Sequence, residues 1–184
     1  DSEFQINNYV TNDQSNPSVA ALSGGGFVVT WHSGGQDGSL HGVYGQIYDA
    51  LGVKVGIEFQ VNTYTTRDQI YPTVAGLFNG SFVVTWQSDG QDGSSGGIYG
   101  QRYDASGAKI DNEFLINTYT ANYQSNPSVA ALAGGDFVVT WVSDMQDGSK
   151  YGIFGQRYDG KGAKIGSEFQ INTYTSGLQY APSV

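Results

Sequence analysis

The chain repeats itself every 55 residues. The stretch FVVTWHSGGQDGSLHGVYGQIYD begins at Phe27 and returns, with few changes, at Phe82 and Phe137. No insertion or deletion separates the copies, and 27 of the 55 aligned positions are identical in all three. Internal periods of this length indicate repeat architectures, in which each unit is one supersecondary element. The sequence predicts one repeat domain that divides as 1–55 (repeat 1), 56–110 (repeat 2), 111–165 (repeat 3) and 166–184 (a partial fourth repeat).

Each unit has the pattern of four short strands. In repeat 1, EFQIN from Glu3 alternates apolar and polar residues and predicts a first strand. The second is PSVAAL, which begins at Pro17, where a proline is tolerated at the start of a strand. FVVTW and the run ending in Tyr48-Asp49 predict the third and fourth strands, with a turn at Gly52. Turn residues separate all four.

Four antiparallel strands in a unit of about 40–55 residues are typical of a β-propeller blade. The fold class predicted here is therefore all-β, with tandem propeller-like blades, and the alternative is a β-solenoid-like array. Three units are fewer than the four to eight blades that close a ring. We therefore expect spare edge strands to associate with neighbouring repeats or with other copies of the chain.

Composition excludes several partners. The chain carries 8 basic and 17 acidic residues, a formal net charge of −9, so we expect no binding to nucleic acid phosphates. No apolar run approaches the roughly 18 residues of a membrane-spanning helix, so membrane insertion is not expected. There is no cysteine, so neither disulfides nor thiol chemistry are available.

The loop QDGS carries the repeated acidic residues. Asp and Ser oxygens beside a glycine turn are ligands of the kind that Ca²⁺ prefers, and they predict a calcium site. The alternative is that Asp-Gly only turns the chain, with the carboxylate capping backbone amides. The candidate metal ligands are Asp37, Asp89, Asp92, Asp144 and Asp147.

The same loop and the strand after it supply candidate ligand contacts. Tyrosine rings beside amide and hydroxyl groups suit a saccharide, because ring faces stack on sugar CH groups while polar side chains bond hydroxyls. The alternative is that these residues are ordinary strand and loop residues. The candidate ligand-binding residues are Gln36, Ser39, Tyr44, Gln91, Ser94, Tyr99, Gln146 and Ser149.

The residues give little support to an enzyme. His32 and His41 are the only histidines, and both lie in repeat 1. No histidine cluster suits zinc, and a Ser–His–acid triad would leave the other repeats inert. The sequence predicts that the chain is not an enzyme and that it needs no cofactor other than calcium.

The recurring FVVTW…QDGS…GIYGQRYD…EFQINTYT pattern resembles a tandem repeat of very large secreted or surface proteins, often found beside RTX-type calcium repeats and adhesin modules. The resemblance implies an extracellular or cell-surface location. We therefore expect a non-enzymatic module for adhesion or for assembly of a surface matrix or filament. The alternative is a multivalent lectin with one saccharide site per repeat and a surface polysaccharide as its partner.

Overall fold

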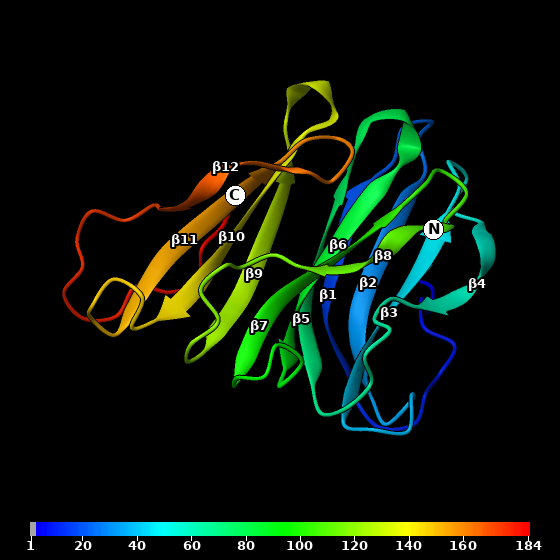
Figure 1. Cartoon of the computed structure of the whole chain (residues 1–184). Coiled ribbons are helices and arrows are strands. Elements are labelled where there is room, and N and C mark those ends of the chain that lie inside the picture. Colours follow the sequence, from blue (N-terminus) through cyan, green and yellow to red (C-terminus); the bar gives the residue numbers. More distant parts are fainter. Residues whose placement is uncertain (1–2) are drawn as a thin grey trace.

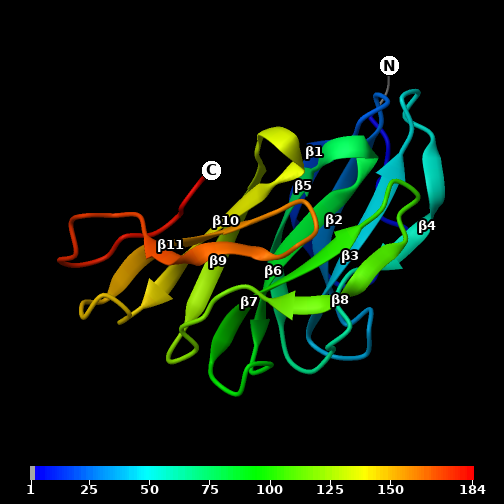
Figure 2. The same cartoon turned by 45° about the horizontal axis from the view of Figure 1, so that its top comes forward.

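The computed structural model describes residues 3–184 and consists of three four-stranded antiparallel sheets (Figure 1). Within each sheet the strands follow chain order, so that each strand pairs with the next. The three sheets stand side by side in chain order from blue to orange (Figures 1 and 2).

The strands of the three sheets have the following bounds. The first sheet contains β1 (Gln14–Ala21), β2 (Phe27–Gly34), β3 (His41–Tyr48) and β4 (Lys54–Gln60). The second contains β5 (Gln69–Gly76), β6 (Phe82–Asp89), β7 (Gly96–Tyr103) and β8 (Lys109–Leu115). The third contains β9 (Gln124–Ala131), β10 (Phe137–Asp144), β11 (Tyr151–Tyr158) and β12 (Lys164–Gln170). Two single-turn 3₁₀ helices, η1 (Phe78–Gly80) and η2 (Ala133–Gly135), follow β5 and β9.

The sheets are packed as propeller blades. The first strand of each sheet lies beside the first strand of the next, β1 beside β5 and β5 beside β9, and the chain then runs outward through each sheet. This arrangement confirms the predicted propeller-like all-β fold. No helix in the region 3–184 has the length and apolar character needed to cross a membrane.

The strand order differs from the predicted one. EFQ, expected to open a unit, ends β4, which pairs with β3 and is the outermost strand of the preceding sheet. Connection length explains the difference. The turn over residues 49–53 makes β3 and β4 a hairpin, whereas residues 61–68 cross to the next blade. The sheets therefore span 14–60, 69–115 and 124–170, out of phase with the sequence units.

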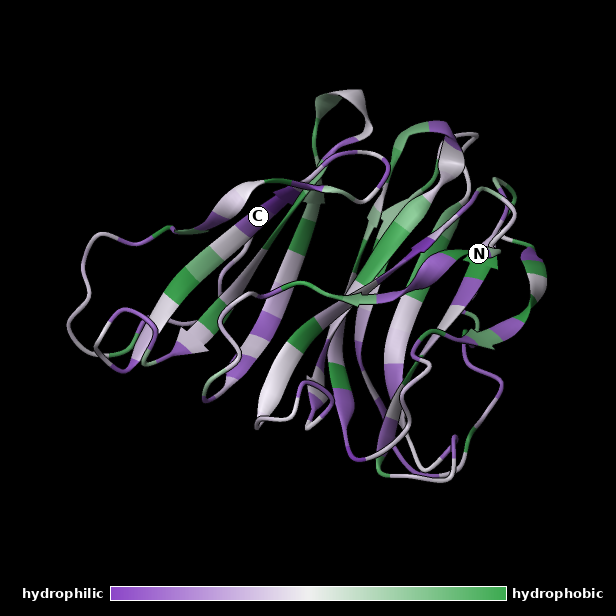
Figure 3. Ribbon diagram, in the orientation of Figure 1, coloured by the Kyte–Doolittle hydropathy of each residue, from purple (hydrophilic) through white to green (hydrophobic). Residues whose placement is uncertain are grey.

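The core lies between the sheets. Val28 and Val43 of the first sheet pack in one cluster with Phe82 and Trp86 of the second, and an equivalent cluster joins the second sheet to the third. Hydrophobic bands on the strands alternate with polar ones (Figure 3), as expected when every middle strand is covered on both faces.

The two ends of the blades carry different loops. The Gly-rich turns with η1 and η2 lie at the upper end in Figure 1. The QDGS loops and the connections from one blade to the next lie together at the lower end. This lower end, where β1, β5 and β9 begin, is called the axial face below.

Candidate binding site at the axial face

Each innermost strand is distorted near the axial face. Asn16, Tyr71 and Asn126 have φ of 51°, 54° and 51°, and each precedes a proline. The pairing register shifts at this point in all three sheets, which identifies a β-bulge. A positive φ is costly for a bulky residue such as Tyr71, and such strain is concentrated at functional sites.

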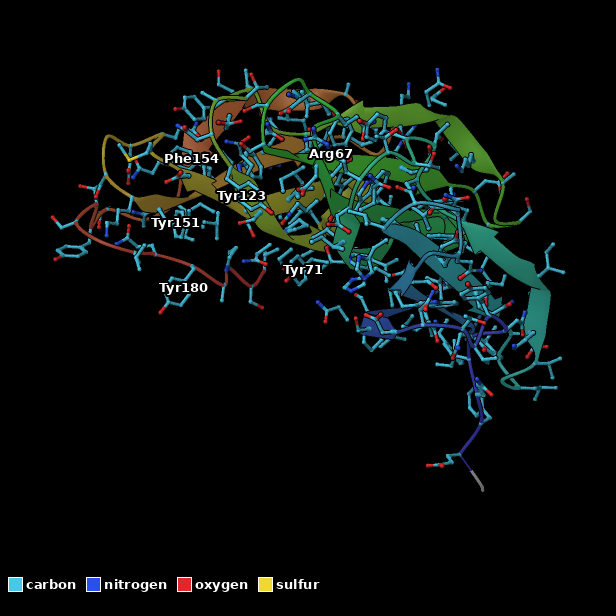
Figure 4. All side chains as sticks on the ribbon, turned by 90° about the horizontal axis from the view of Figure 1, so that it is seen from below. Arg67, Tyr71, Tyr123, Tyr151, Phe154 and Tyr180 are labelled. Carbon is cyan, nitrogen blue, oxygen red and sulfur yellow. The ribbon has the colours of Figure 1, made fainter. Side chains whose placement is uncertain are left out.

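The bulges line a recess between the innermost strands. Its volume is about 400 Å³, and its walls include Asn16, Tyr71, Asn126 and the prolines that follow them. Tyr71 is 40% exposed there. Viewed from below, Figure 4 shows Tyr71, Tyr123 and Tyr151 at this end of the molecule. The recess therefore offers aromatic and amide side chains to a ligand.

The junction between the first and second blades is built from two histidines. His41 Nδ1 lies 2.7 Å from Asp68 Oδ1, and its Nε2 lies 3.5 Å from Asp13 Oδ2. His32 Nε2 lies 2.7 Å from Ser15 Oγ, and its Nδ1 accepts from the backbone N–H of Tyr71 at 3.3 Å. The accepting role of Nδ1 indicates that a neutral His32 carries its proton on Nε2.

The two histidines differ in charge behaviour. Burial lowers the pKa of His32, and the neighbouring His41 lowers it further. Burial also acts to lower the pKa of His41, but the hydrogen bond and charge of Asp68, with Asp13, outweigh it and raise the pKa. The junction therefore pairs one imidazole that gains a proton less readily than usual with one that gains a proton more readily.

The junction between the second and third blades has a phenol, an amide and a carboxylate. The fully buried Gln87 donates through Nε2 to Tyr123 Oη at 2.5 Å and to Asp89 Oδ1 at 3.3 Å. The Tyr123 ring lies against Gly96, where a Cβ would be 2.9 Å from the ring. Only a glycine at this position lets the ring approach so closely.

Burial also changes acidity at this junction. It raises the pKa of Asp89, and the charge of Asp68 adds to the increase, while hydrogen bonding from Gln87 and Tyr123 opposes it. Burial raises the pKa of Tyr123 as well, and Asp89 adds to that effect. Asp89 is thus a carboxyl group that is protonated more easily than an exposed aspartate.

A third junction, between the third blade and the chain segment that follows β12, is more apolar. Val142 occupies the position of His32 and Gln87, and Tyr151 occupies that of His41 and Gly96. Tyr151 forms a parallel bridge with Leu178, and its carbonyl accepts from Gln179 N at 3.1 Å.

The QDGS loops form turns held from within. Asp37 Oδ1 accepts from the backbone N–H of Ser39 at 3.0 Å, and Asp92 and Asp147 do the same in their repeats. Gln36 Nε2 donates to Glu58 Oε1 at 2.6 Å. The same Gln–Glu bond forms in the other repeats, from Gln91 to Glu113 and from Gln146 to Glu168. Each of these glutamates also accepts from a backbone N–H 50 residues earlier, so it ties the outermost strand of its sheet to the segment that leads into that sheet.

The other predicted site residues are dispersed. Tyr44 and Tyr99 are buried between strands, whereas Ser39 and Ser94 donate to backbone oxygens of the next connection. Asp89 accepts a hydrogen bond from Gln87, whereas Asp92 accepts one from Ser94 of its own loop. Asp144 donates its backbone N–H to Tyr123 O at 2.9 Å. Across residues 3–184 no three His, Cys, Asp or Glu side chains are grouped as a metal site would require. Calcium binding and the QDGS saccharide contacts stay predictions.

The axial residues Asp13, Asp68, Gln87 and Tyr123 were not among the predicted ligand contacts. They come from different repeats, and pairing across blades cannot be read from one unit. One signal was present. The strand FVVTW is identical in all units, yet the buried residue after it is His32, Gln87 or Val142. When one buried position varies in an otherwise constant strand, the residues that pack against that position differ between repeats.

Comparison with known proteins gives the fold. No protein-family model matches the chain, and no curated protein does. Among solved structures, an endo-arabinase from Bacteroides thetaiotaomicron VPI-5482 is similar, with a TM-score of 0.61 and 15% identity over 92% of this chain. A thermostable family-43 glycoside hydrolase has a TM-score of 0.58 and 15% identity over 90% of this chain. An alpha-L-arabinofuranosidase from Lactobacillus brevis has a TM-score of 0.50 and 15% identity over 85% of this chain. This chain spans 66%, 58% and 56% of those three chains.

The prediction that the chain is not an enzyme is wrong, since these structures of the same fold are glycoside hydrolases. The prediction assumed that repeated units must have repeated sites. In the axial face the scaffold repeats, but His41, Gln87 and Asp89 have no identical set in the other blades. A repeated fold can therefore hold one unrepeated centre, and the lack of cysteine or a histidine cluster does not exclude carboxylate chemistry.

Proposed function

We propose that the chain is a carbohydrate-binding β-propeller module whose saccharide site is the axial face. One observation carries the proposal: strained bulges turn Tyr71, Asn16 and Asn126 into one recess, where repeat 2 supplies an aromatic ring and repeats 1 and 3 supply an amide. A tyrosine ring beside amide groups, with imidazole and carboxylate groups at the neighbouring junctions, suits a sugar, which has apolar CH faces and polar hydroxyls. The similar structures described above are carbohydrate-active enzymes, and this supports the same class of ligand.

The proposal favours the saccharide alternative over adhesion or filament assembly as the primary role. An extracellular location, surface polysaccharide as the natural partner, and self-association through edge strands remain compatible predictions. None of them is needed for the axial site, because its residues all belong to one chain.

Replacing Tyr71 with asparagine tests the site. Asparagine is present at the equivalent positions, Asn16 and Asn126, with nearly the same φ, so the fold is expected to persist. Loss of the ring is expected to weaken saccharide binding about fivefold, or ~1 kcal/mol. Calorimetric titration with linear arabinan, xylan and cellulose oligosaccharides measures it. The matched control is Tyr174→Asn, which removes a 71% exposed tyrosine from the segment that follows β12. Equal affinities for the wild type and Y71N would contradict the axial site.

Hydrolysis is a second candidate function, favoured by Asp89 at the second junction and by Asp68 of the first junction, whose charge acts on Asp89. Asp89 has a raised pKa because of burial and the charge of Asp68, as a general acid requires. Glycoside hydrolysis generally uses two carboxyl groups in different protonation states. Release of reducing ends from arabinan is then expected to fall as the pH rises through the pKa of Asp89. Asp89→Asn is expected to lower the rate at least 100-fold, whereas Asp92→Asn leaves it largely unchanged. A D89N variant with wild-type rate would remove this candidate.

A further inference from the structure

The residue after the strand tryptophan gives each blade junction its own chemistry. This position holds His32, Gln87 or Val142, and all three side chains are buried. The strand before it is FVVTW in every blade, and the serine after it is constant. The substitutions therefore follow what lies across the junction and not the packing within the blade.

At the first two junctions the buried side chain holds a group of the axial face. His32 accepts from the backbone N–H of Tyr71, whose ring lies 5.9 Å from the imidazole. Gln87 donates to the Tyr123 hydroxyl and to Asp89. Val142 has no polar atom to offer. The buried side chain thus changes along the chain, from an imidazole at the first junction, to an amide that holds a phenol at the second, to an apolar side chain at the third.

The charges at this face select against anions. Four aspartates lie at this face. Asp13 and Asp68 immediately precede β1 and β5, and Asp89 and Asp144 end β6 and β10. Arg67 is the nearby arginine, its guanidinium lying over Gly90. The other two arginines are paired elsewhere, Arg102 with Asp111 and Arg157 with Asp136. Four aspartates face Arg67 and His41, which already lies against Asp68 and Asp13, so the face stays acidic and a uronate or sulfate group would meet net repulsion.

We propose that the axial face binds an uncharged oligosaccharide laid across consecutive blade junctions, with Gln87 as the positioning residue of the middle subsite. This inference rests on the proposed saccharide function and adds the ligand's length, charge and a specificity residue. One sugar unit meets each junction, because the innermost strands β1, β5 and β9 lie directly side by side and the buried side chain at each junction differs, being His32, Gln87 or Val142. A single sugar would contact one junction only.

Gln87 acts through Tyr123. Its amide fixes the phenol hydroxyl, and Gly96 supports the ring, so the ring is held in one orientation before the ligand arrives. Preorganisation of this kind lowers the entropic cost of binding. Gln87 itself is fully buried, so its side chain has no surface to offer a ligand directly.

Length dependence and one exchange of residues test the proposal. Calorimetric titration would compare neutral arabinan oligosaccharides of one to five units with oligogalacturonates of the same lengths. The affinity for arabinan oligosaccharides is expected to rise at least tenfold from one unit to three and then to level off. Oligogalacturonates are expected to bind at least tenfold more weakly than arabinan oligosaccharides of the same length. Gln87→Val imports the valine-type side chain of the third blade and is expected to weaken the trisaccharide fivefold or more, with the monosaccharide changed less than twofold. Tyr123→Phe, which keeps the ring, is expected to reproduce that split.

Each outcome is decisive. Equal affinity for one and three units, or tighter binding of oligogalacturonates, would overturn this inference while leaving saccharide binding intact. A uniform loss for every length in Gln87→Val, with Tyr123→Phe like the wild type, would show that Gln87 is structural only. No binding of any oligosaccharide by the wild type would overturn the proposed function together with this inference.

Discussion

Asn117→Ala is expected to lower the free energy of unfolding by about 3–4 kcal/mol. Asn117 is 1% exposed and lies where the chain crosses from the second blade to the third. Its Oδ1 accepts from Ile98 N at 2.7 Å, and its Nδ2 donates to Tyr119 O at 2.9 Å and to Gln124 Oε1 at 3.3 Å. Alanine would leave these buried partners unsatisfied, and each such group costs about 1–3 kcal/mol.

The chain supplies a matched control for this prediction. Asn172 makes the same three kinds of bond, to Ile153 N, Tyr174 O and Gln179 Oε1, but water reaches this site. Asn172→Ala is expected to cost about 1 kcal/mol or less, because water replaces the lost partners. Urea denaturation followed by circular dichroism measures both variants. Equal losses would show that burial does not cause the effect.

Much of the fold could be predicted because its causes are local. The fixed FVVTW strand, the Gly-Asp turns and the 55-residue period define a β unit without knowledge of its neighbours. The assignment of EFQ to the wrong sheet shows the limit. In the sequence, the tight turn at Gly52 and the crossing over residues 61–68 both look like polar connections. Only the pairing of β4 with β3 shows that EFQ belongs to the sheet before the crossing.

The axial site was less accessible to sequence reasoning, because its residues meet across blades. The acidic residues of the QDGS loop predict a site there, yet Asp37 bonds to Ser39 of its own loop and Gln36 bonds to Glu58. What a repeat keeps constant is what every blade needs in order to pack. Residues that serve one place only, such as Gln87 and Tyr123, are therefore found where the repeats disagree. In a repeat protein, differences between units are the better guide to a unique site.

Trp86→Ala is expected to lower the free energy of unfolding by about 4 kcal/mol, the usual range for a buried aromatic being 3–5 kcal/mol. Trp86 is fully buried in the cluster that joins the first blade to the second. Its indole Nε1 has no hydrogen-bond partner among the described residues, so the ring is held by packing alone. A domain of this size is stable by about 5–15 kcal/mol, so the loss would be a large share of the total.

Comparison of the three equivalent tryptophans separates packing between blades from packing within a blade. Trp141 is fully buried between the second and third blades, and Trp141→Ala is expected to match Trp86→Ala within about 1 kcal/mol. Trp31 belongs to a smaller cluster beside a groove of about 300 Å³, so Trp31→Ala is expected to cost about 2 kcal/mol less. Loss of contact between blades should also broaden the urea transition, because the first blade can unfold before the others. Three equal losses with unchanged slopes would indicate that the tryptophans stabilise each sheet on its own, and that the blades are joined mainly by polar ties such as Asn117.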